Sequence, residues 1–283
     1  MKLDLLVVGL VLLSALIHAS WNAIVKSDRD QLVSFALVMF AGTVMGLIAV
    51  PFLSLPGAAA WPFLIASTLI HNAYYFFLLR AYAHGDLSHV YPIARGLGPL
   101  LVALLSGTLI GEHLTAGEAA GVSLVSVGII ALALSKGLPR ASEWRPTLYA
   151  VATGATIAGY TIVDGLGARA SNDALSYIAW LNVLEGPWVM LVAIMQRGRA
   201  IAPYLRKHAW RGVAGGVIAT VGYGIAIWAL SLGAMAHVAA LRETSVLFGA
   251  LIGTVLLREA FGFRRVIAAA LIVGGLLLMH IPF

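Results

Sequence analysis

The sequence contains no cysteine and very little charge. Lys, Arg, Asp and Glu together make up 11% of its 283 residues, against about 25% in ordinary soluble domains. The absence of cysteine excludes disulfide bonds, thiolate metal sites and a thiol nucleophile. The scarcity of charge leaves too little polar surface to cover a water-soluble fold of this length.

Hydrophobic residues dominate the composition of the chain. They form 61% of the sequence, and the mean hydropathy is +0.95, which indicates a lipid bilayer as solvent. A spanning helix needs about 20 residues, so about ten spans would leave only short connections and no separate soluble domain. Ten apolar runs lie at 4–26, 31–54, 62–82, 88–110, 115–135, 147–167, 174–195, 210–231, 235–257 and 263–281. The first resembles a signal peptide, but no A-x-A-like cleavage site follows it, so we expect a retained span.

The two halves of the chain resemble each other. "ALIHASWNAIV" aligns with "GATIAGYTIVD", which sets Trp21 opposite Tyr160, and a later pair of segments sets Arg95 opposite Arg242. We predict a first five-helix repeat at 1–136, an inter-repeat loop at 137–146 and a second five-helix repeat at 147–283. Two copies of an odd number of spans insert in opposite senses. The predicted fold is therefore an all-α integral membrane protein with ten transmembrane helices, arranged as two inverted five-helix repeats around a central cavity.

The basic residues are distributed unequally between the two sides of the predicted bundle. Most of the 18 Lys and Arg fall in the odd-numbered connections, whereas Lys2 and Arg169 fall on the other side. Such a bias places the odd connections in the cytoplasm and both termini outside it, in a multi-pass protein of the inner (plasma) membrane. The basic loops then contact anionic lipid headgroups, and we expect no nucleic-acid partner.

Several segments resemble the drug/metabolite transporter superfamily, specifically its EamA-type ten-helix members. "GEHLTAGEAAGVSLVSVGIIAL" and "REAFGFRRVIAAALIVGGLLLM" are similar to the family's Gly-Glu turn followed by a glycine-marked fifth helix, once per repeat. "HASWNAIVK" and "AGYTIVD" are similar to its aromatic-polar signatures. The resemblance implies a basket of two inverted halves that exports or exchanges small metabolites, as bacterial exporters of amino acids do, aromatic ones included.

Polar residues on one face of the first span are the first candidates for substrate contact. His18, Trp21 and Asn22 follow an i, i+3, i+4 pattern, so they form a helical stripe that would be costly against lipid. Trp21 and Asn22 offer a stacking face and a hydrogen-bonding amide. The alternative interpretation is helix packing, but Tyr160 at the matching position favours a cavity wall.

The third span carries a second group of polar and aromatic residues. His71 and Tyr75 lie at i and i+4, with Asn72 beside them, and such side chains need partners inside a membrane. An aromatic and amide wall suits an amphiphilic ligand such as an amino acid. A hydrogen bond between helices, with packed aromatic rings, explains the pattern equally well.

The fourth and ninth spans each place an arginine deep in the membrane. Arg95 follows Tyr91 in a segment loosened by prolines and glycines, and its counterpart Arg242 precedes Glu243. Each arginine needs a carboxylate, a carbonyl or water. Both a local or cross-repeat ion pair and direct recognition of a substrate carboxylate remain open for these arginines. Glycine pairs elsewhere in the chain, such as Gly42 with Gly46, indicate close helix crossings rather than a binding site.

The seventh span contains the most informative carboxylate. Asn182, Glu185 and Trp188 recur at three-residue spacing, and Glu185 lies near mid-span. A carboxylate at that depth is protonated or paired. We expect proton coupling or ammonium recognition, or else a structural pair with an arginine.

Aromatic residues of the sixth and eighth spans complete the candidate site. Tyr160 is followed one turn later by Asp164, which either binds an amino group or a proton or forms a solvated helix end. Tyr223 is a plausible wall, and placement in the aromatic belt at the lipid interface explains it equally well. The predicted substrate-binding residues are thus His18, Trp21, Asn22, His71, Asn72, Tyr75, Tyr91, Arg95, Tyr160, Asn182, Glu185, Trp188, Tyr223 and Arg242.

The function predicted from these features is secondary transport of small metabolites, amino acids first, by alternating access. No nucleotide-binding G-x-x-x-x-G-K-[ST] occurs, so transport driven by ATP bound to this chain is not expected. We also found no H-E-x-x-H and no G-x-S-x-G motif, which argues against an integral-membrane enzyme. A passive channel is the other alternative. We expect no cofactor and no metal, and a monomer or weak homodimer.

Overall fold

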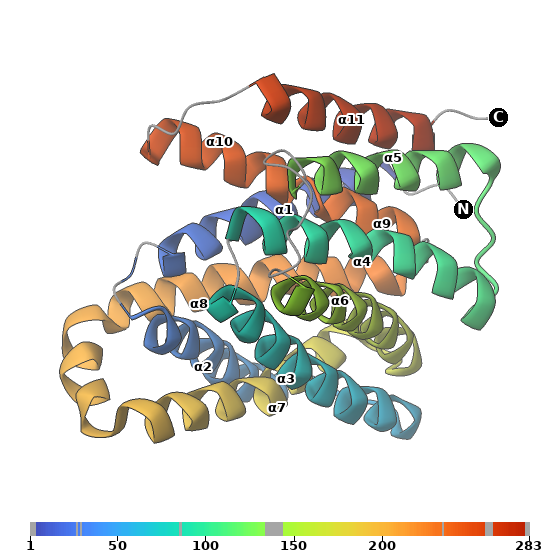
Figure 1. Cartoon of the computed structure of the whole chain (residues 1–283). Helices are drawn as coiled ribbons and strands as arrows, with labels where there is room; N and C mark the ends of the chain where they lie inside the picture. The colour runs from blue at the N-terminus through green and yellow to red at the C-terminus, as the bar shows by residue number, and fades with distance from the viewer. Residues whose placement is uncertain are drawn as a thin grey trace.

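The computed structural model describes residues 4–26, 28, 30–84, 87–133, 144–233, 235–257 and 263–280. Regular structure in that part of the chain is helical, with no strand (Figure 1). The α-helices are α1 (Leu5–Lys26), α2 (Gln31–Ala49), α3 (Trp61–His84), α4 (Leu87–Leu109), α5 (Ala116–Ala133), α6 (Trp144–Ala170), α7 (Ala174–Arg197), α8 (Ile201–Ser231), α9 (Met235–Arg242), α10 (Ser245–Leu257) and α11 (Phe263–His280). Short 3₁₀ turns lie at Val50–Phe52, Ala58–Ala60 and Gly198–Ala200. Each predicted span contains one α-helix, except the ninth, which contains two.

Six of the spans within the described residues are long and apolar enough to cross a bilayer. They are Leu5–Val25, Gln31–Phe52, Ala58–Ala81, Val90–Leu109, Ala174–Arg197 and Ile201–Ser231. Ala116–Ala131 and Val266–Met279 are shorter apolar helices. The length of these segments matches the roughly 20 residues that a bilayer requires, so the chain is a multi-pass membrane protein.

The ninth predicted span, 235–257, is not one continuous helix, and this part of the prediction was wrong. α9 ends at Arg242 and α10 begins at Ser245. The backbone N–H groups of Glu243 and Thr244 donate to carbonyls three residues earlier, and the Thr244 hydroxyl donates to the Leu241 carbonyl. These tight turns and the side-chain hydrogen bond replace the i→i−4 ladder, which interrupts the helix.

Three other predicted boundaries also differ from the structure. α8 begins at Ile201 rather than 210, with Pro203 in its first turn, where a missing N–H is tolerated. At 31 residues and about 1.5 Å per residue, α8 is longer than the hydrocarbon layer is thick. α2 ends at Ala49, where a 3₁₀ turn with Pro51 follows. α6 begins at Trp144, inside the predicted loop 137–146, whose earlier residues lie outside the described part.

Most extensive helix contacts join the first half of the chain to the second. α2 packs along α7, and α5 packs along α11 (Figure 1). α6 packs against α3 and α4, while α1 packs against α8, α9 and α10. The helices of the two halves are therefore interleaved, and the centre of the bundle receives side chains from both.

Glycines allow the closest of these crossings. A Cβ atom on Gly121 would lie 2.6 Å from the Gly275 carbonyl oxygen, and one on Gly275 would lie 2.6 Å from the Gly121 carbonyl oxygen. A Cβ atom on Gly46 of α2 would lie 2.6 Å from the Ala179 carbonyl oxygen of α7. The close crossing predicted for Gly46 is thus confirmed, and small residues bring the backbones together at both crossings.

Replacing Gly275 by alanine is expected to destabilise the fold. The added methyl group meets the Gly121 carbonyl oxygen first, and then Cγ2 and the backbone N of Val125, so the helices must separate, at a cost of about 1–3 kcal/mol. Thermal unfolding of the purified protein in detergent measures the effect. Gly249→Ala in α10 is the control, because nothing lies within 4 Å of its added Cβ. Equal melting temperatures for the two variants would contradict the prediction.

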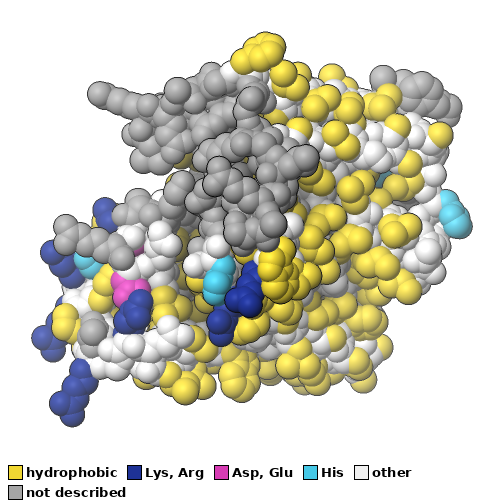
Figure 2. Space-filling model, viewed as in Figure 1, with side chains coloured by type: hydrophobic (Ala, Val, Ile, Leu, Met, Phe, Trp, Pro, Cys, Tyr) yellow, Lys and Arg dark blue, Asp and Glu magenta, His cyan; other side chains and the backbone are white. Residues whose placement is uncertain are grey.

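The surface of the bundle is apolar along the helices and basic at one end. Figure 2 shows hydrophobic side chains over the flank of the molecule, and Lys and Arg gathered at its left end. That end carries the α7–α8 connection (Figure 1). Large exposed apolar side chains such as Leu69, Leu104 and Met195 are ordinary where the solvent is lipid.

One ion pair at the basic end joins the two halves. The Arg197 Nε lies 2.7 Å from Asp30 Oδ2, and Asp30 also caps α2 by accepting from the Val33 N–H. The hydrogen bond from Arg197 holds the pKa of the Asp30 carboxyl below its ordinary value. Both side chains remain substantially exposed, so this pair contributes little to stability.

Candidate functional site

Seven residues from five helices meet in the centre of the bundle and form the central polar cluster. α3 supplies two of them, α6 supplies two, and α7, α8 and α9 supply one each. They contact one another through hydrogen bonds and aromatic rings. The cluster consists of His71, Tyr75, Tyr160, Asp164, Glu185, Tyr223 and Arg242. All but Asp164 are predicted substrate-binding residues.

Glu185 lies at one side of the cluster and is only 4% exposed. The Tyr75 hydroxyl donates a hydrogen bond to Glu185 Oε1, and His71 Nε2 lies 4.0 Å from the same oxygen. His71 Nδ1 in turn lies 3.1 Å from the Ser67 hydroxyl. No arginine pairs with Glu185 among the described residues, so the predicted structural ion pair is not what holds it. The carboxylate depends on one hydroxyl and one imidazole.

Asp164 is the second buried carboxylate, with no exposed surface. It accepts a hydrogen bond of 3.0 Å from the Tyr177 hydroxyl of α7 and one of 2.5 Å from the Tyr223 hydroxyl of α8. The interpretation of Asp164 as a solvated helix end was therefore wrong. α6 continues to Ala170, and the helices packed around this turn remove it from solvent.

Aromatic rings connect the two carboxylates. The His71 ring stacks on Tyr160 with centroids 4.2 Å apart and planes 19° apart. Tyr223 approaches His71 edge-on at 5.7 Å and Tyr160 at 6.2 Å. Stacked and edge-on arrangements at these distances are the favourable ones for aromatic pairs. The rings form a continuous wall that a flat or apolar group could lie against.

The two buried arginines have different surroundings. Arg95 of α4 forms an ion pair of 2.9 Å with Glu243 and donates to the Ser245 hydroxyl at 3.0 Å. This is the cross-repeat ion pair that was one of the two predicted outcomes. Arg242 is 7% exposed, and its guanidinium lies over the Tyr223 ring, 5.1 Å from the centroid. No carboxylate among the described residues lies within ion-pair distance of Arg242. Its charge is the one that an anionic ligand group could neutralise.

The stripe of the first span reaches the cluster through an aromatic chain. His18 contacts Trp21 edge-on at 5.3 Å, and Trp21 stacks on Phe35 of α2 at 6.1 Å. Phe35 contacts Tyr75 edge-on at 5.1 Å. The structure thus connects His18 and Trp21 with the Glu185 side of the cluster, by way of a phenylalanine that the sequence did not single out.

The three candidate asparagines share one local arrangement. The side-chain amides of Asn22, Asn72 and Asn182 each donate to the carbonyl four residues earlier in their own helix. The Asn182 side-chain oxygen also accepts from Thr220 at 3.4 Å, across the α7–α8 contact. One of the two N–H donors of each amide is therefore occupied, and Asn182 contributes to helix packing.

Two other candidates stand apart from the central polar cluster. Trp188 is 54% exposed, and no ring contact in the described part of the chain joins it to the cluster. Its three-residue spacing from Glu185 turns it onto a neighbouring face of α7. Tyr91 is partly buried on α4, one turn before Arg95.

Some residues of the site had weak signals in the sequence or none. Ser67 could have been found, because it lies one turn before His71 on the same helix. Tyr177 was not singled out, since it lies in the first turn of α7, where tyrosines often mark the membrane interface. Phe35 stands in an apolar run that gives no sign of a special role.

The arrangement is suited to binding rather than to covalent chemistry. It presents a guanidinium without a carboxylate partner among the described residues, two carboxylates and an aromatic wall in a buried site. No group of three or more metal-ligating side chains occurs among the described residues. A ligand with a positive group, a negative group and an apolar part would find a complement for each.

Comparisons with known proteins agree with the fold. A family model described as the EamA-like transporter family matches residues 144–281. A solved structure titled only "Crystal structure of protein" superposes with a TM-score of 0.76 and 21% sequence identity, over 97% of this chain and 96% of its own. At that identity the likeness shows the fold alone. No curated protein matches the sequence.

Proposed function

Because a model of the EamA-like transporter family matches residues 144–281 of this chain, we propose that it is a secondary transporter of small zwitterionic metabolites, with amino acids as the leading substrate class. The family match confirms the resemblance predicted from the sequence, and it implies a transporter of small solutes rather than an enzyme. Substrate class, direction and mechanism are our proposal.

The observation that carries the proposal is the unpaired, buried Arg242 in the same cluster as Glu185. Arg95 is already paired with Glu243, whereas the Arg242 guanidinium lies over the Tyr223 ring and has no carboxylate within ion-pair distance among the described residues. A substrate carboxylate would form a charge-assisted pair with Arg242, which in a buried site is stronger than a neutral hydrogen bond. The ammonium group of the same substrate would replace the Tyr75 hydroxyl or the His71 ring as the partner of Glu185.

The aromatic wall between these charges accounts for the amphiphilic part of the substrate. Tyr160, His71 and Tyr223 lie between Arg242 and Glu185 in the chain of contacts. Apolar or aromatic side chains of an amino acid would pack against these rings. A zwitterion carries no net charge, so binding adds one partner for each uncompensated group without leaving a new buried charge.

The packing of the helices supports alternating access between inverted repeats. In the predicted repeats the counterparts are α1 and α6, α2 and α7, α3 and α8, α4 and the α9–α10 pair, and α5 and α11. Exchanging each helix for its counterpart converts the α3–α6 contact into the α8–α1 contact. The same exchange converts α4–α6 into the contacts of α9 and α10 with α1, and it leaves α2–α7 and α5–α11 as pairs. Two related five-helix units packed about a common axis produce this pattern, and such units rock around a site near the midplane. The concentration of Lys and Arg at one end (Figure 2) supports a cytoplasmic location of that end in the inner membrane, with both termini outside.

Counterflow in proteoliposomes tests the proposal. Vesicles containing the purified protein are loaded with a mixture of unlabelled amino acids and diluted into radiolabelled ones. We expect transient accumulation of at least one labelled amino acid well above that in protein-free vesicles. A passive channel would equilibrate the label without accumulating it. If no amino acid accumulates, while the protein is folded and correctly reconstituted, the amino-acid assignment is wrong.

A further inference from the structure

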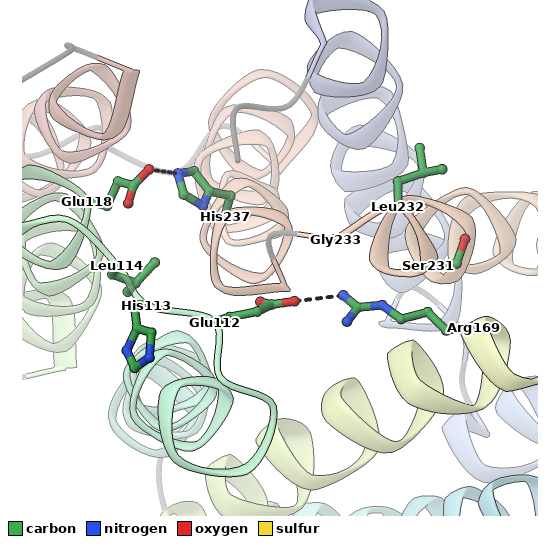
Figure 3. Close-up of a pocket in the computed structure, with 9 residues that line it drawn as sticks. All are labelled: Glu112, His113, Leu114, Glu118, Arg169, Ser231, Leu232, Gly233 and His237. Carbon is green, nitrogen blue, oxygen red and sulfur yellow. Dashed lines mark hydrogen bonds and ion pairs between the residues drawn. The ribbon is translucent and has the colours of Figure 1, made fainter.

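Away from the central polar cluster, a pocket of about 410 Å³ opens at the end of the bundle where α4 connects to α5 (Figure 3). The C-terminal end of α6 and the turn between α8 and α9 also border it. Two acid–base pairs lie in its wall: Glu112 with Arg169, and Glu118 with His237. In each pair the acid comes from the first half of the chain and the base from the second.

Glu112 binds two segments of the second half directly and a third through Arg169. Its Oε1 accepts a hydrogen bond of 2.8 Å from Arg169 Nη2 at the end of α6, and its Oε2 accepts one of 2.9 Å from the Met235 backbone N–H at the start of α9. Arg169 also donates to the Leu230 carbonyl near the end of α8, at 3.1 and 3.3 Å. The preceding Gly111 has a φ of +76°, a conformation that glycine adopts without strain, and this turn carries the Glu112 side chain to its partners.

Glu118 and His237 form the second link. His237 Nε2 lies 3.2 Å from Glu118 Oε1, and the other carboxylate oxygen accepts from the Thr115 backbone N–H at 2.7 Å. His237 lies within α9, five residues before Arg242. The helix that presents Arg242 to the central polar cluster is therefore bound near its start to the first turn of α5.

A set of buried apolar side chains, here called the apolar layer, involves the same helices as these links. Val102 of α4, Ile162 of α6 and Leu230 of α8 pack there with Ala239 and Leu241 of α9. These residues are buried, and Ala239 and Leu241 lie on α9 between His237 at the pocket and Arg242 in the central polar cluster. Along α9, a polar link to the first half of the chain is therefore followed by buried apolar residues before Arg242 is reached.

The carboxylates and Arg169 have their partners within the protein, which argues against a ligand site at this position. Both oxygens of Glu112 and both oxygens of Glu118 have partners, and Arg169 has two acceptors. A bound ligand would have to replace existing hydrogen bonds. Contacts that are complete within the protein and that join its two halves are what a closed gate requires.

We propose that the Glu112–Arg169 and Glu118–His237 pairs are a latch that holds this end of the bundle closed and must open in each transport cycle. The inference rests on the proposed alternating access, because only a mechanism that separates the halves at one end at a time needs such a device. Opening breaks the polar links, moves α9 away from the α4–α5 turn and exposes the apolar layer. The Asp30–Arg197 pair, at the opposite end, is not part of this latch.

The experiment measures opening without any substrate. The chain contains no cysteine, so Ala239→Cys introduces a single thiol in the apolar layer at a position that is 6% exposed. The rate at which a charged maleimide labels this thiol in purified protein reports how often the layer becomes accessible. Glu112→Gln, which removes the charge but keeps an acceptor for Met235, is expected to raise that rate at least about tenfold. Glu118→Gln is expected to raise it as well.

Two matched variants show whether the effect belongs to the latch. Asp30→Asn breaks the ion pair at the opposite end and is expected to leave the labelling rate within about twofold. Arg169→Lys keeps the charge and is expected to retain most of the protection. Thermal melting identifies any variant that labels quickly because it is unfolded. For that case, a reducible bismaleimide that joins Glu112→Cys to Arg169→Cys in the double variant should block counterflow, and reduction of the cross-link should restore it.

The outcomes separate this inference from the proposed function. Faster labelling in Glu112→Gln and Glu118→Gln, without amino-acid counterflow in the parent protein, supports the latch and contradicts the substrate assignment. Unchanged labelling in both folded variants overturns the latch, whatever the transport assay gives. Transport that continues at the full rate in cross-linked protein overturns it too.

Discussion

Arg242→Met is expected to abolish amino-acid counterflow, the largest effect of any single substitution proposed for this protein. Arg242 is the buried cation that lacks a carboxylate partner among the described residues. Methionine keeps much of the side chain's apolar volume but removes the charge. Losing one partner of a buried charge pair costs about 2–5 kcal/mol, so substrate affinity should fall by at least roughly 30-fold.

The measurement is counterflow at several substrate concentrations, which separates affinity from rate. Arg242→Lys keeps a charge without the planar donor fork, so we expect an intermediate loss. Arg211→Met is the matched control, because Arg211 is exposed on α8 and lies outside the cluster. If Arg242→Met transports like the control, Arg242 does not bind the substrate carboxylate, and the zwitterion model is wrong.

Glu185→Gln is expected to have the second largest effect. Glutamine is nearly isosteric and still accepts from Tyr75, but it can neither pair with an ammonium group nor exchange a proton. If Glu185 recognises the ammonium group, counterflow without a pH gradient is lost by about 30-fold or more. If Glu185 carries a coupled proton instead, exchange continues while uptake driven by a pH gradient disappears.

The same two assays therefore assign the role of Glu185. Removing a buried carboxylate can also stabilise a protein, so a raised melting temperature together with lost transport would indicate a functional residue rather than a structural one. Tyr75→Phe is a useful companion, because it removes the hydroxyl donor and leaves the charge in place. Undiminished exchange and undiminished gradient-driven uptake in Glu185→Gln would remove this residue from the mechanism.

The sequence predicted the positions of the helices well because hydropathy is a local property. Each apolar run contains helix, and the largest boundary errors lie where helix formation does not depend on the membrane. α8 extends beyond the bilayer-length run to Ile201, since a basic amphipathic segment remains helical in water or among headgroups. The break after Arg242 was not foreseen, because it depends on how Glu243 and Thr244 fold back on α9.

The sequence also identified most of the central polar cluster, for a physical reason. A histidine, carboxylate or arginine in the middle of an apolar run is costly against lipid, so His71, Glu185 and Arg242 could be expected to face the interior. Spacing alone could not exclude Trp188, which shares a three-residue interval with Glu185 but lies on a more exposed face. Asp164 was misjudged because solvation at a helix end depends on neighbouring helices.

By itself, the sequence determined that this chain is a helical membrane protein with polar and charged side chains inside its apolar runs. These properties follow from transfer free energies and periodicity, which are fixed residue by residue. Only the tertiary structure decided which charges meet: Arg95 with Glu243, Tyr75 with Glu185, and Glu112 with Arg169. Each of these contacts joins the two halves of the chain, and pairing over such separations depends on how the helices pack, which no local pattern encodes.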